Sequence, residues 1–173
     1  VYHNPSTDQH TYLSAFQTGG SYFGINLRRR GNNRNYNLIT GNLADNGVNL
    51  DVEFNFVSNN AYSPDNTWVH ILISVDLTNT ANRHIYLSDE VPAYISWASY
   101  LNTDIDFTKN KWSIGRDAYG TEEMDGRLAG VYLDYTYRDL SVEANRRDFI
   151  DADGLYVTPP TTGIISVPMD DPE

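Results

Sequence analysis

A succession of short strand-type segments, separated by turn residues, constrains this chain more than any other feature. Tyrosine, valine, isoleucine and threonine recur within the segments, whereas glycine, asparagine, aspartate and proline cluster between them. Many short strands at this spacing favour a β-sandwich or barrel over alternating β–α–β units. The expected strands are Thr11–Phe16, Tyr22–Arg28, Tyr36–Thr40, Asn49–Val57, Trp68–Asp76, His84–Leu87, Ala93–Trp97, Trp112–Arg116 and Arg127–Tyr137.

Two of these segments alternate between apolar and mixed positions. In the segment 68–76, the apolar face consists of Val69, Ile71, Ile73 and Val75. In the segment 127–137, it consists of Ala129, Val131, Leu133, Tyr135 and Tyr137. Because side chains in a strand point alternately to opposite faces, we expect each strand to bury one face and to leave the other partly wet.

One helix is expected near the C-terminus, over Val142–Ile150. Ser141 stands where an N-cap residue belongs, and Glu143 lies in the first turn, where the helix dipole favours a negative charge. We expect Phe149 and Ile150 to anchor this helix to the strands. A chain of 173 residues fits one domain.

Five segments in the second half of the chain resemble a laminin-G-type domain, also called concanavalin A-like. They are Trp68–Asp76, Ile85–Asp89, Ile114–Arg116, Gly126–Val131 and Leu140–Ser141. The resemblance implies an all-β, antiparallel two-sheet jelly-roll sandwich that binds partners more often than it catalyses a reaction. Asp89-Glu90 replaces the Asp-Gly turn of that pattern, so we expect the hairpin to bend differently here.

The sandwich is expected to span residues 1–157, and residues 158–173 predict an extended C-terminal arm because they hold four of the seven prolines. The segment Asn145–Gly154, followed by this proline-rich stretch, is similar to segments that close such domains in structural proteins of bacteriophages. The resemblance implies a non-catalytic module on the virion surface, in capsid decoration or in the tail. The alternative is a carbohydrate-binding, lectin-like module of a larger bacterial adhesin or enzyme, extracellular or at the cell surface.

Charge narrows the range of partners. The chain has 12 basic and 23 acidic residues and a formal net charge of −11. Such a surface repels nucleic acid and anionic lipid, and no run approaches the roughly 18 apolar residues of a membrane span, so we expect neither nucleic-acid binding nor membrane insertion. Cysteine is absent, which excludes a disulfide-stapled module.

Hydrolytic chemistry is not expected. Glycosidases on this fold place two carboxylates on one face of a strand, as nucleophile and as acid/base. Glu123-Met-Asp125 matches in part, but Arg127 occupies the position of the next acid. One acid cannot serve both roles, so we interpret this motif as a solvated acidic loop and the protein as no enzyme.

Calcium is a candidate ligand because carboxylate and amide oxygens are its preferred donors. Asp151-Ala-Asp153 imitates the start of an EF-hand loop but lacks the distal glutamate. Two further candidate pairs are Asp76 with Asn79 and Asp117 with Asp125. The alternative is ordinary turn chemistry of aspartate and glycine.

Two surface contacts are also expected. Sugar rings stack on aromatic side chains and their hydroxyls bind amides, which makes Tyr94, Trp97, Tyr100 and Asn102 the carbohydrate-binding candidates. The alternative is that these aromatics pack inward. Arg28, Arg29, Arg30 and Arg34 form a basic stretch that we expect to meet an acidic face of a neighbouring subunit or virion protein.

Overall fold

The computed structural model describes most of the chain, with gaps. The described residues are 2–3, 10–16, 23–30, 35–41, 50–57, 67–92, 94–100, 107–117, 120, 122–163 and 165–168. Over these residues the protein is all-β, with antiparallel strand pairs and one short helix, as the sequence predicts.

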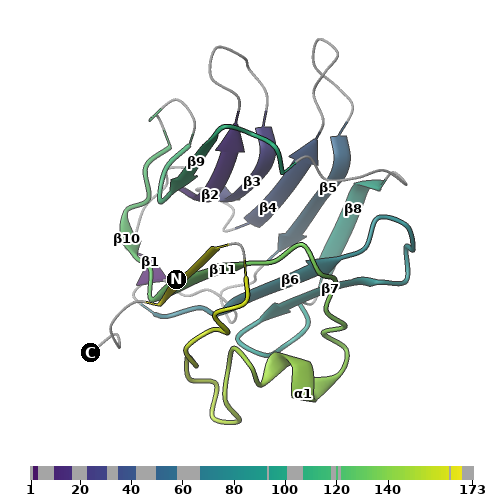
Figure 1. The fold of residues 1–173 in the computed structure, drawn as a ribbon, viewed down its shortest axis with the longest axis vertical. Helices are drawn as coiled ribbons and strands as arrows, with labels where there is room; N and C mark the ends of the chain where they lie inside the picture. The colour runs from purple at the N-terminus through teal and green to yellow at the C-terminus, as the bar shows by residue number, and fades with distance from the viewer. Residues whose placement is uncertain are drawn as a thin grey trace.

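The largest element is a six-stranded antiparallel sheet with the order β8-β5-β4-β3-β2-β9 (Figure 1). Its strands are β2 (His10–Phe16), β3 (Phe23–Arg30), β4 (Asn35–Gly41), β5 (Leu50–Val57), β8 (Tyr94–Tyr100) and β9 (Lys111–Ile114). Each strand lies within three residues of its predicted limits. β8 and β9 are successive in the chain but form opposite edges, so the connection between them crosses the whole sheet.

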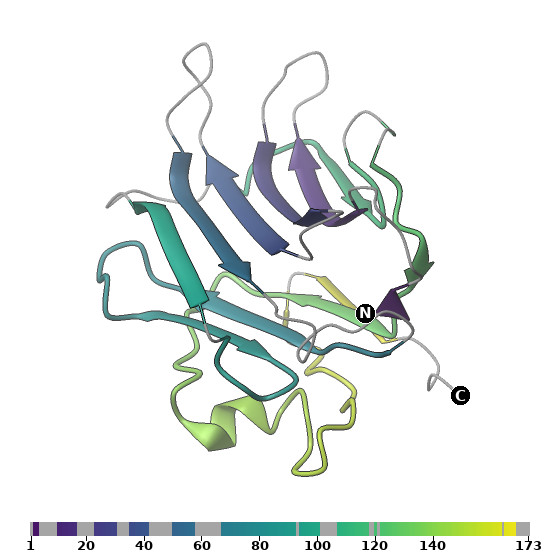
Figure 2. The ribbon, with the colours of Figure 1, turned by 180° about the vertical axis from the view of Figure 1, so that it is seen from behind.

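The remaining strands form three two-stranded pairs. They are β6 (Ile71–Val75) with β7 (Arg83–Leu87), β11 (Gly130–Leu133) with β12 (Ile165–Pro168), and β1 (Tyr2–His3) with β10 (Gly126–Arg127). The first two pairs lie across from the six-stranded sheet in both views (Figures 1 and 2). The strand predicted over 127–137 is thus two strands, interrupted where Ala129 is buried.

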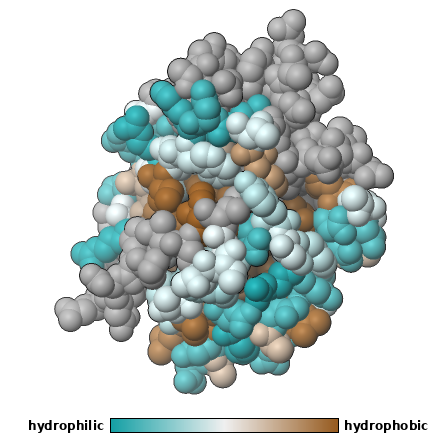
Figure 3. Space-filling view, in the orientation of Figure 1, coloured by the Kyte–Doolittle hydropathy of each residue, from teal (hydrophilic) through white to brown (hydrophobic). Residues whose placement is uncertain are grey.

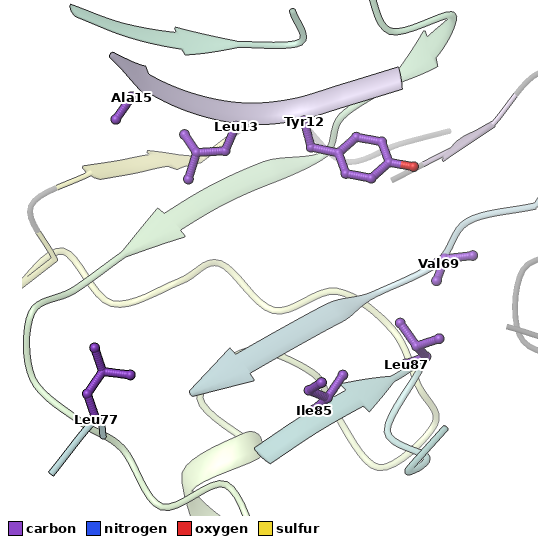
Figure 4. Close-up of a cluster of buried hydrophobic side chains, with 7 residues drawn as sticks. All are labelled: Tyr12, Leu13, Ala15, Val69, Leu77, Ile85 and Leu87. Atoms are coloured by element: carbon purple, nitrogen blue, oxygen red, sulfur yellow. The ribbon is translucent and has the colours of Figure 1, made fainter. Parts of the chain in front are cut away.

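Apolar side chains fill the space between the two layers. Tyr12, Leu13 and Ala15 of β2 face Ile85 and Leu87 of β7 (Figure 4). The apolar face predicted for segment 68–76 contributes to the same cluster: Val69 is buried, and Ile71, Ile73 and Val75 pack against it. Burial of these side chains stabilises the fold through the hydrophobic effect.

A second apolar cluster covers the opposite face of the β6–β7 hairpin. Leu72 of β6 packs there with Leu140, Phe149 and Ile150 of the C-terminal segment. The predicted anchoring role of Phe149 and Ile150 is confirmed, since Phe149 is 6% exposed and Ile150 is fully buried. The face of this strand that was expected to be partly wet is so, since Trp68, His70, Ser74 and Asp76 are partly exposed, and only Leu72 is buried, under the C-terminal segment.

The helix α1 (Glu143–Arg146) is shorter than the predicted helix, and its N-cap is Val142 rather than Ser141. The Asp139 carboxylate accepts hydrogen bonds from both the backbone N–H and the hydroxyl of Ser141, at 2.9 and 2.6 Å. Ser141 is therefore engaged in the turn before the helix and makes no cap. After Arg146 the chain leaves the helix in a turn that brings Phe149 and Ile150 into the second cluster.

The turn after β7 has a strained backbone. Ser88 and Asp89 have φ values of 47° and 67°, and Leu87 and Glu90 exchange both backbone hydrogen bonds. This is a two-residue hairpin turn with both central residues left-handed, a conformation that Asp-Gly adopts with less strain. The Asp89 carboxylate is held by Arg146 at 2.5 Å and by Arg147 at 2.8 Å, which ties the turn to α1.

The predicted C-terminal arm is extended over Ile165–Pro168, but this part of it belongs to the folded body. It pairs in antiparallel register with β11, from Gly130 opposite Pro168 to Leu133 opposite Ile165. Ile165 packs against the main core cluster. This part of the arm is therefore engaged within the molecule rather than with a neighbouring subunit.

Candidate functional site

The four carbohydrate-binding candidates do not form one surface. Tyr94 begins β8 and is 58% exposed, whereas Asn102 lies outside the described residues. Positions 94 and 97 differ by an odd number in an extended strand, so they lie on opposite faces of the sheet. The strand register places position 97 in one row with Leu27 and Leu13, which belong to the core side. The expected cluster is therefore divided by the sheet.

The opposite face of the six-stranded sheet carries rows of polar residues instead. One cross-strand row is Arg28, Asn37, Asn55 and Ser96. The next is Ser113, Ser14, Asn26, Ile39, Glu53 and Ser99. The register thus aligns mostly polar positions on the side of the sheet opposite the row of Leu13 and Leu27. Polar and apolar residues alternate in the sequence around Tyr36 and Phe54, and this alternation could have indicated a polar face. The cross-strand register was needed to show which residues become neighbours.

A loop that follows β9 ties down one end of this polar face. The Glu122 carboxylate accepts a hydrogen bond from the Thr11 hydroxyl at 3.0 Å and pairs with Arg28 at 3.4 Å. Its backbone N–H in turn donates to Asp117, which is 4% exposed. On the core side of the same strands, fully buried His10 lies in register with Arg29, and its Nδ1 accepts the backbone N–H of Asp125. The loop is thus fixed by polar contacts on both sides of β2.

Two buried polar side chains lie on the strands that this loop contacts. Ser14 and Asn26 are neighbours across β2 and β3 and are 0% and 1% exposed. Among the described residues, the Ser14 hydroxyl and the Asn26 side-chain oxygen have no hydrogen-bond partner. An unpaired buried polar atom costs free energy, so these two atoms need hydrogen-bond partners beyond the described residues.

The expected basic contact surface is wrong at two of its four positions. Arg29 is fully buried, and Arg28 is paired with Glu122 inside the molecule. The reason is strand alternation, because consecutive residues of β3 point to opposite faces and cannot form one patch. Arg34 lies outside the described residues, and Arg30 ends β3.

The acidic motif precedes β10 in a loop. Glu123 and Asp125 are both exposed, and the Asp125 backbone N–H donates a hydrogen bond to His10. Glycosidases need two carboxyl groups set at a fixed separation of about 5–9.5 Å on either side of a bound sugar. The exposed loop fits the predicted solvated acidic segment.

The calcium candidates are engaged in turns. Asp151 Oδ1 accepts backbone N–H groups of Asp153 and Leu155, at 2.9 and 2.8 Å. The Asp76 carboxylate accepts hydrogen bonds from Thr78 and Asn82, which lower its pKa. Over the described ranges, three or more acidic or histidine side chains do not gather around one point that could hold a metal ion.

Two histidines lie on the β6–β7 hairpin in different surroundings. His70 is partly buried, and this burial is the main cause that lowers its pKa to about 4. His84 Nε2 lies 2.9 Å from the Tyr137 hydroxyl and 3.3 Å from an oxygen of Asp139. Burial, and then the negative charge of Asp139, raise the pKa of Tyr137.

The surface outside these groups is mixed. Figure 3 shows separate brown apolar patches within a largely polar face. The large exposed apolar residues are Val91, Tyr94, Ile114, Tyr135, Val142 and Leu155. Within the described part of the chain, no helix has the length and apolar composition that a bilayer crossing requires.

Comparison with known proteins adds no relative. No protein-family model, no curated protein and no solved structure matches the chain.

Proposed function

We propose that this chain is a laminin-G-type jelly-roll sandwich that serves as a non-catalytic structural module of a bacteriophage particle, in capsid decoration or in the tail. It acts at the virion surface through contacts with other virion proteins or with copies of itself. The observation that carries the proposal is the closing segment Asn145–Gly154. It resembles the segments that close such domains in phage structural proteins, and its Phe149 and Ile150 are buried.

The packing of this segment supports the proposal. Phe149 and Ile150 complete the second apolar cluster, while Arg146 and Arg147 hold the strained turn at Asp89. Arg146 also lies over the Tyr86 ring at 4.3 Å. The segment therefore closes the β6–β7 hairpin by hydrophobic, ionic and cation–π contacts together. A module closed by such contacts is suited to holding a fixed surface in an assembly.

Particle fractionation tests this role. Particles from the source are purified on a density gradient, probed with an antibody against the chain, and imaged by cryo-electron microscopy. We expect the chain to co-sediment with particles and to occupy repeated positions on the capsid or tail. A monomer that stays in the soluble fraction, with no density on the particle, would contradict the virion role.

A second candidate, glycan binding, is favoured by the polar face. The register places positions 37, 55 and 96 in one cross-strand row, and the asparagines and serine there are residue types that hydrogen-bond sugar hydroxyls. A glycan array compares the wild type with Asn55→Ala, and Asn110→Ala, exposed and outside the sheet, serves as the matched control. We expect binding that Asn55→Ala weakens and Asn110→Ala leaves unchanged. Absence of binding to every glycan would contradict this candidate.

A further inference from the structure

We propose that His84, Tyr137 and Asp139 form a binding site for a divalent transition-metal ion such as Zn²⁺, which fastens the β6–β7 hairpin to the C-terminal segment. His84 belongs to β7, and the other two residues belong to the stretch that leads into α1. The site is independent of the virion role, because it concerns the interior of one chain.

The first observation is that two oxygen atoms lie at one histidine nitrogen. His84 Nε2 is 2.9 Å from the Tyr137 hydroxyl and 3.3 Å from Asp139 Oδ1. Two ligands about 2.0–2.1 Å from a zinc ion are roughly 2.8–3.0 Å apart at a right angle and roughly 3.3–3.4 Å apart at the tetrahedral angle. Both separations are therefore those of neighbouring ligands of one ion.

The second observation is that hydrogen bonding alone does not satisfy these contacts. A neutral imidazole nitrogen carries either a proton or a lone pair, so Nε2 completes a full hydrogen bond with only one of the two oxygens. Asp139 Oδ1 already accepts hydrogen bonds from the backbone N–H and the hydroxyl of Ser141, at 2.9 and 2.6 Å. A cation beside Nε2 attracts the nitrogen lone pair and both oxygens at once.

The donor set and its charge select the kind of ion. Imidazole nitrogen suits Zn²⁺ and its first-row neighbours, whereas Ca²⁺ and Mg²⁺ take oxygen ligands. Burial, and then the negative charges of Asp139 and Asp76, raise the pKa of Tyr137. Two carboxylates therefore act on the same hydroxyl, and a cation there is electrostatically favoured. Arg138, which lies between the two oxygen ligands in the sequence, is paired with Asp148.

The site is both accessible and held in place. The side chain of His84 is 18% exposed and that of Asp139 is 45% exposed, so an ion can enter from solvent. Ser74 lies opposite His84 in the strand register, and its hydroxyl accepts the backbone N–H of Arg138 at 3.1 Å. This hydrogen bond fixes the stretch that carries Tyr137 and Asp139 over the hairpin.

Ser141 is a positioning residue in this arrangement. Its backbone N–H and hydroxyl both donate to Asp139 Oδ1, and they orient the carboxylate that binds the ion. Groups that orient metal ligands typically change the affinity by about 10–100-fold when they are removed.

Metal titration of the full, chelator-treated chain tests the site by isothermal calorimetry and by thermal melting. An ion that binds only the folded chain stabilises it, so we expect the melting temperature to rise with Zn²⁺ concentration. We expect at least tenfold weaker binding for His84→Gln and for Asp139→Asn. Asp134→Asn is the matched control, because Asp134 accepts a backbone N–H two residues ahead as Asp139 does, and it should bind as the wild type does. Melting of each metal-free variant confirms that it is folded.

Cobalt distinguishes a ligand from a positioning residue. Co²⁺ bound in place of Zn²⁺ gives visible absorption bands that depend on its ligands. We expect Ser141→Ala to weaken binding about tenfold and to keep the bands of the wild type, since the three ligands remain. Tyr137→Phe removes a ligand and should change the bands.

Nuclear magnetic resonance locates the ion without any substitution. Bound Co²⁺ should broaden and shift the ring signals of His84 before those of the other three histidines. Shifts confined to another histidine would overturn the proposal, and so would unchanged affinity in His84→Gln or Asp139→Asn. A wild type with neither binding heat nor a rise in melting temperature would overturn it as well.

Discussion

The six-stranded sheet and the β6–β7 hairpin use the same alternation of side chains with different results. The sheet has one face on the core, at Leu13 and Leu27, and one polar face. The hairpin is covered on both faces, by the main cluster around Ile85 and by the second cluster around Leu72. The difference teaches that the C-terminal segment completes the interior of the domain on the far side of the hairpin, whereas the second face of the sheet is lined by polar positions, two of which, Ser14 and Asn26, are buried.

Shortening a buried side chain of the second cluster is the strongest test of this comparison between the sheet and the hairpin. We expect Ile150→Ala to lower the free energy of unfolding by about 2–5 kcal/mol, because Ile150 is fully buried and its removal leaves a cavity. Urea unfolding followed by tryptophan fluorescence measures the change. Leu155→Ala, at a residue 63% exposed, is the control and should change stability by no more than about 0.5 kcal/mol. Equal effects would mean that the C-terminal segment is only an attached surface arm.

Lowering the pH should lower the free energy of unfolding, because His70 beside the β6–β7 hairpin is protonated more readily in the unfolded chain. Its pKa falls from 6.5 in the unfolded chain to about 4 in the folded one, so between these values the unfolded chain binds more protons. Stability is therefore complete above pH 6.5 and declines as the pH falls toward 4, by at most about 3 kcal/mol. Urea unfolding from pH 7 to pH 4.5 should show this decline in the wild type and a flatter profile in His70→Gln. An identical profile in the variant would rule out His70 as the cause.

Removing the ionic contacts between the hairpin turn and α1 should lower the free energy of unfolding by a smaller amount. Partial burial opposes ionisation of Asp89, but hydrogen bonds from Arg147 and Arg146 outweigh it and lower its pKa. We expect Asp89→Asn to cost about 1 kcal/mol, since asparagine tolerates the left-handed backbone but loses the charge. Glu143→Gln removes only the exposed pair with Arg147 and should cost less than about 0.5 kcal/mol. Thermal melts that rank the two variants in the reverse order would contradict this assignment.

Substitution on the polar face should have the smallest effect. Ser113 of β9 lies in the polar row and is partly exposed, so Ser113→Ala should change the free energy of unfolding by less than about 0.5 kcal/mol. The measurement is the same urea titration. A loss comparable to that of Ile150→Ala would show that Ser113 is packed as tightly as the second cluster.

The local sequence pattern was sufficient to predict where most strands lie. Alternation and turn residues placed eight segments close to their observed limits, and the burial of Phe149 and Ile150 followed from their apolar character. The ends of elements were less predictable. The hydroxyl of Ser141 had two partners to choose from, the helix start or the Asp139 carboxylate, and the turn geometry decided between them.

The candidate site depended on partners distant in sequence. Tyr94 and Trp97 looked like one cluster because they are close in the chain, but an extended backbone sends them to opposite faces. The arginines of β3 looked like one patch for the same reason. Conversely, Asn37 and Asn55 are distant in sequence and become neighbours through hydrogen bonding between β4 and β5.

By itself the sequence determined that the chain forms antiparallel β-structure with an acidic surface and an apolar C-terminal anchor, because period-two alternation, charge and side-chain hydrophobicity are local properties. Only the tertiary structure decided that the hairpin is covered on both faces, that Arg29 is buried, and that β8 ends the sheet. These features depend on which strands exchange hydrogen bonds. Many pairings of such strands satisfy the same local pattern, and the packing of the whole chain selects one of them.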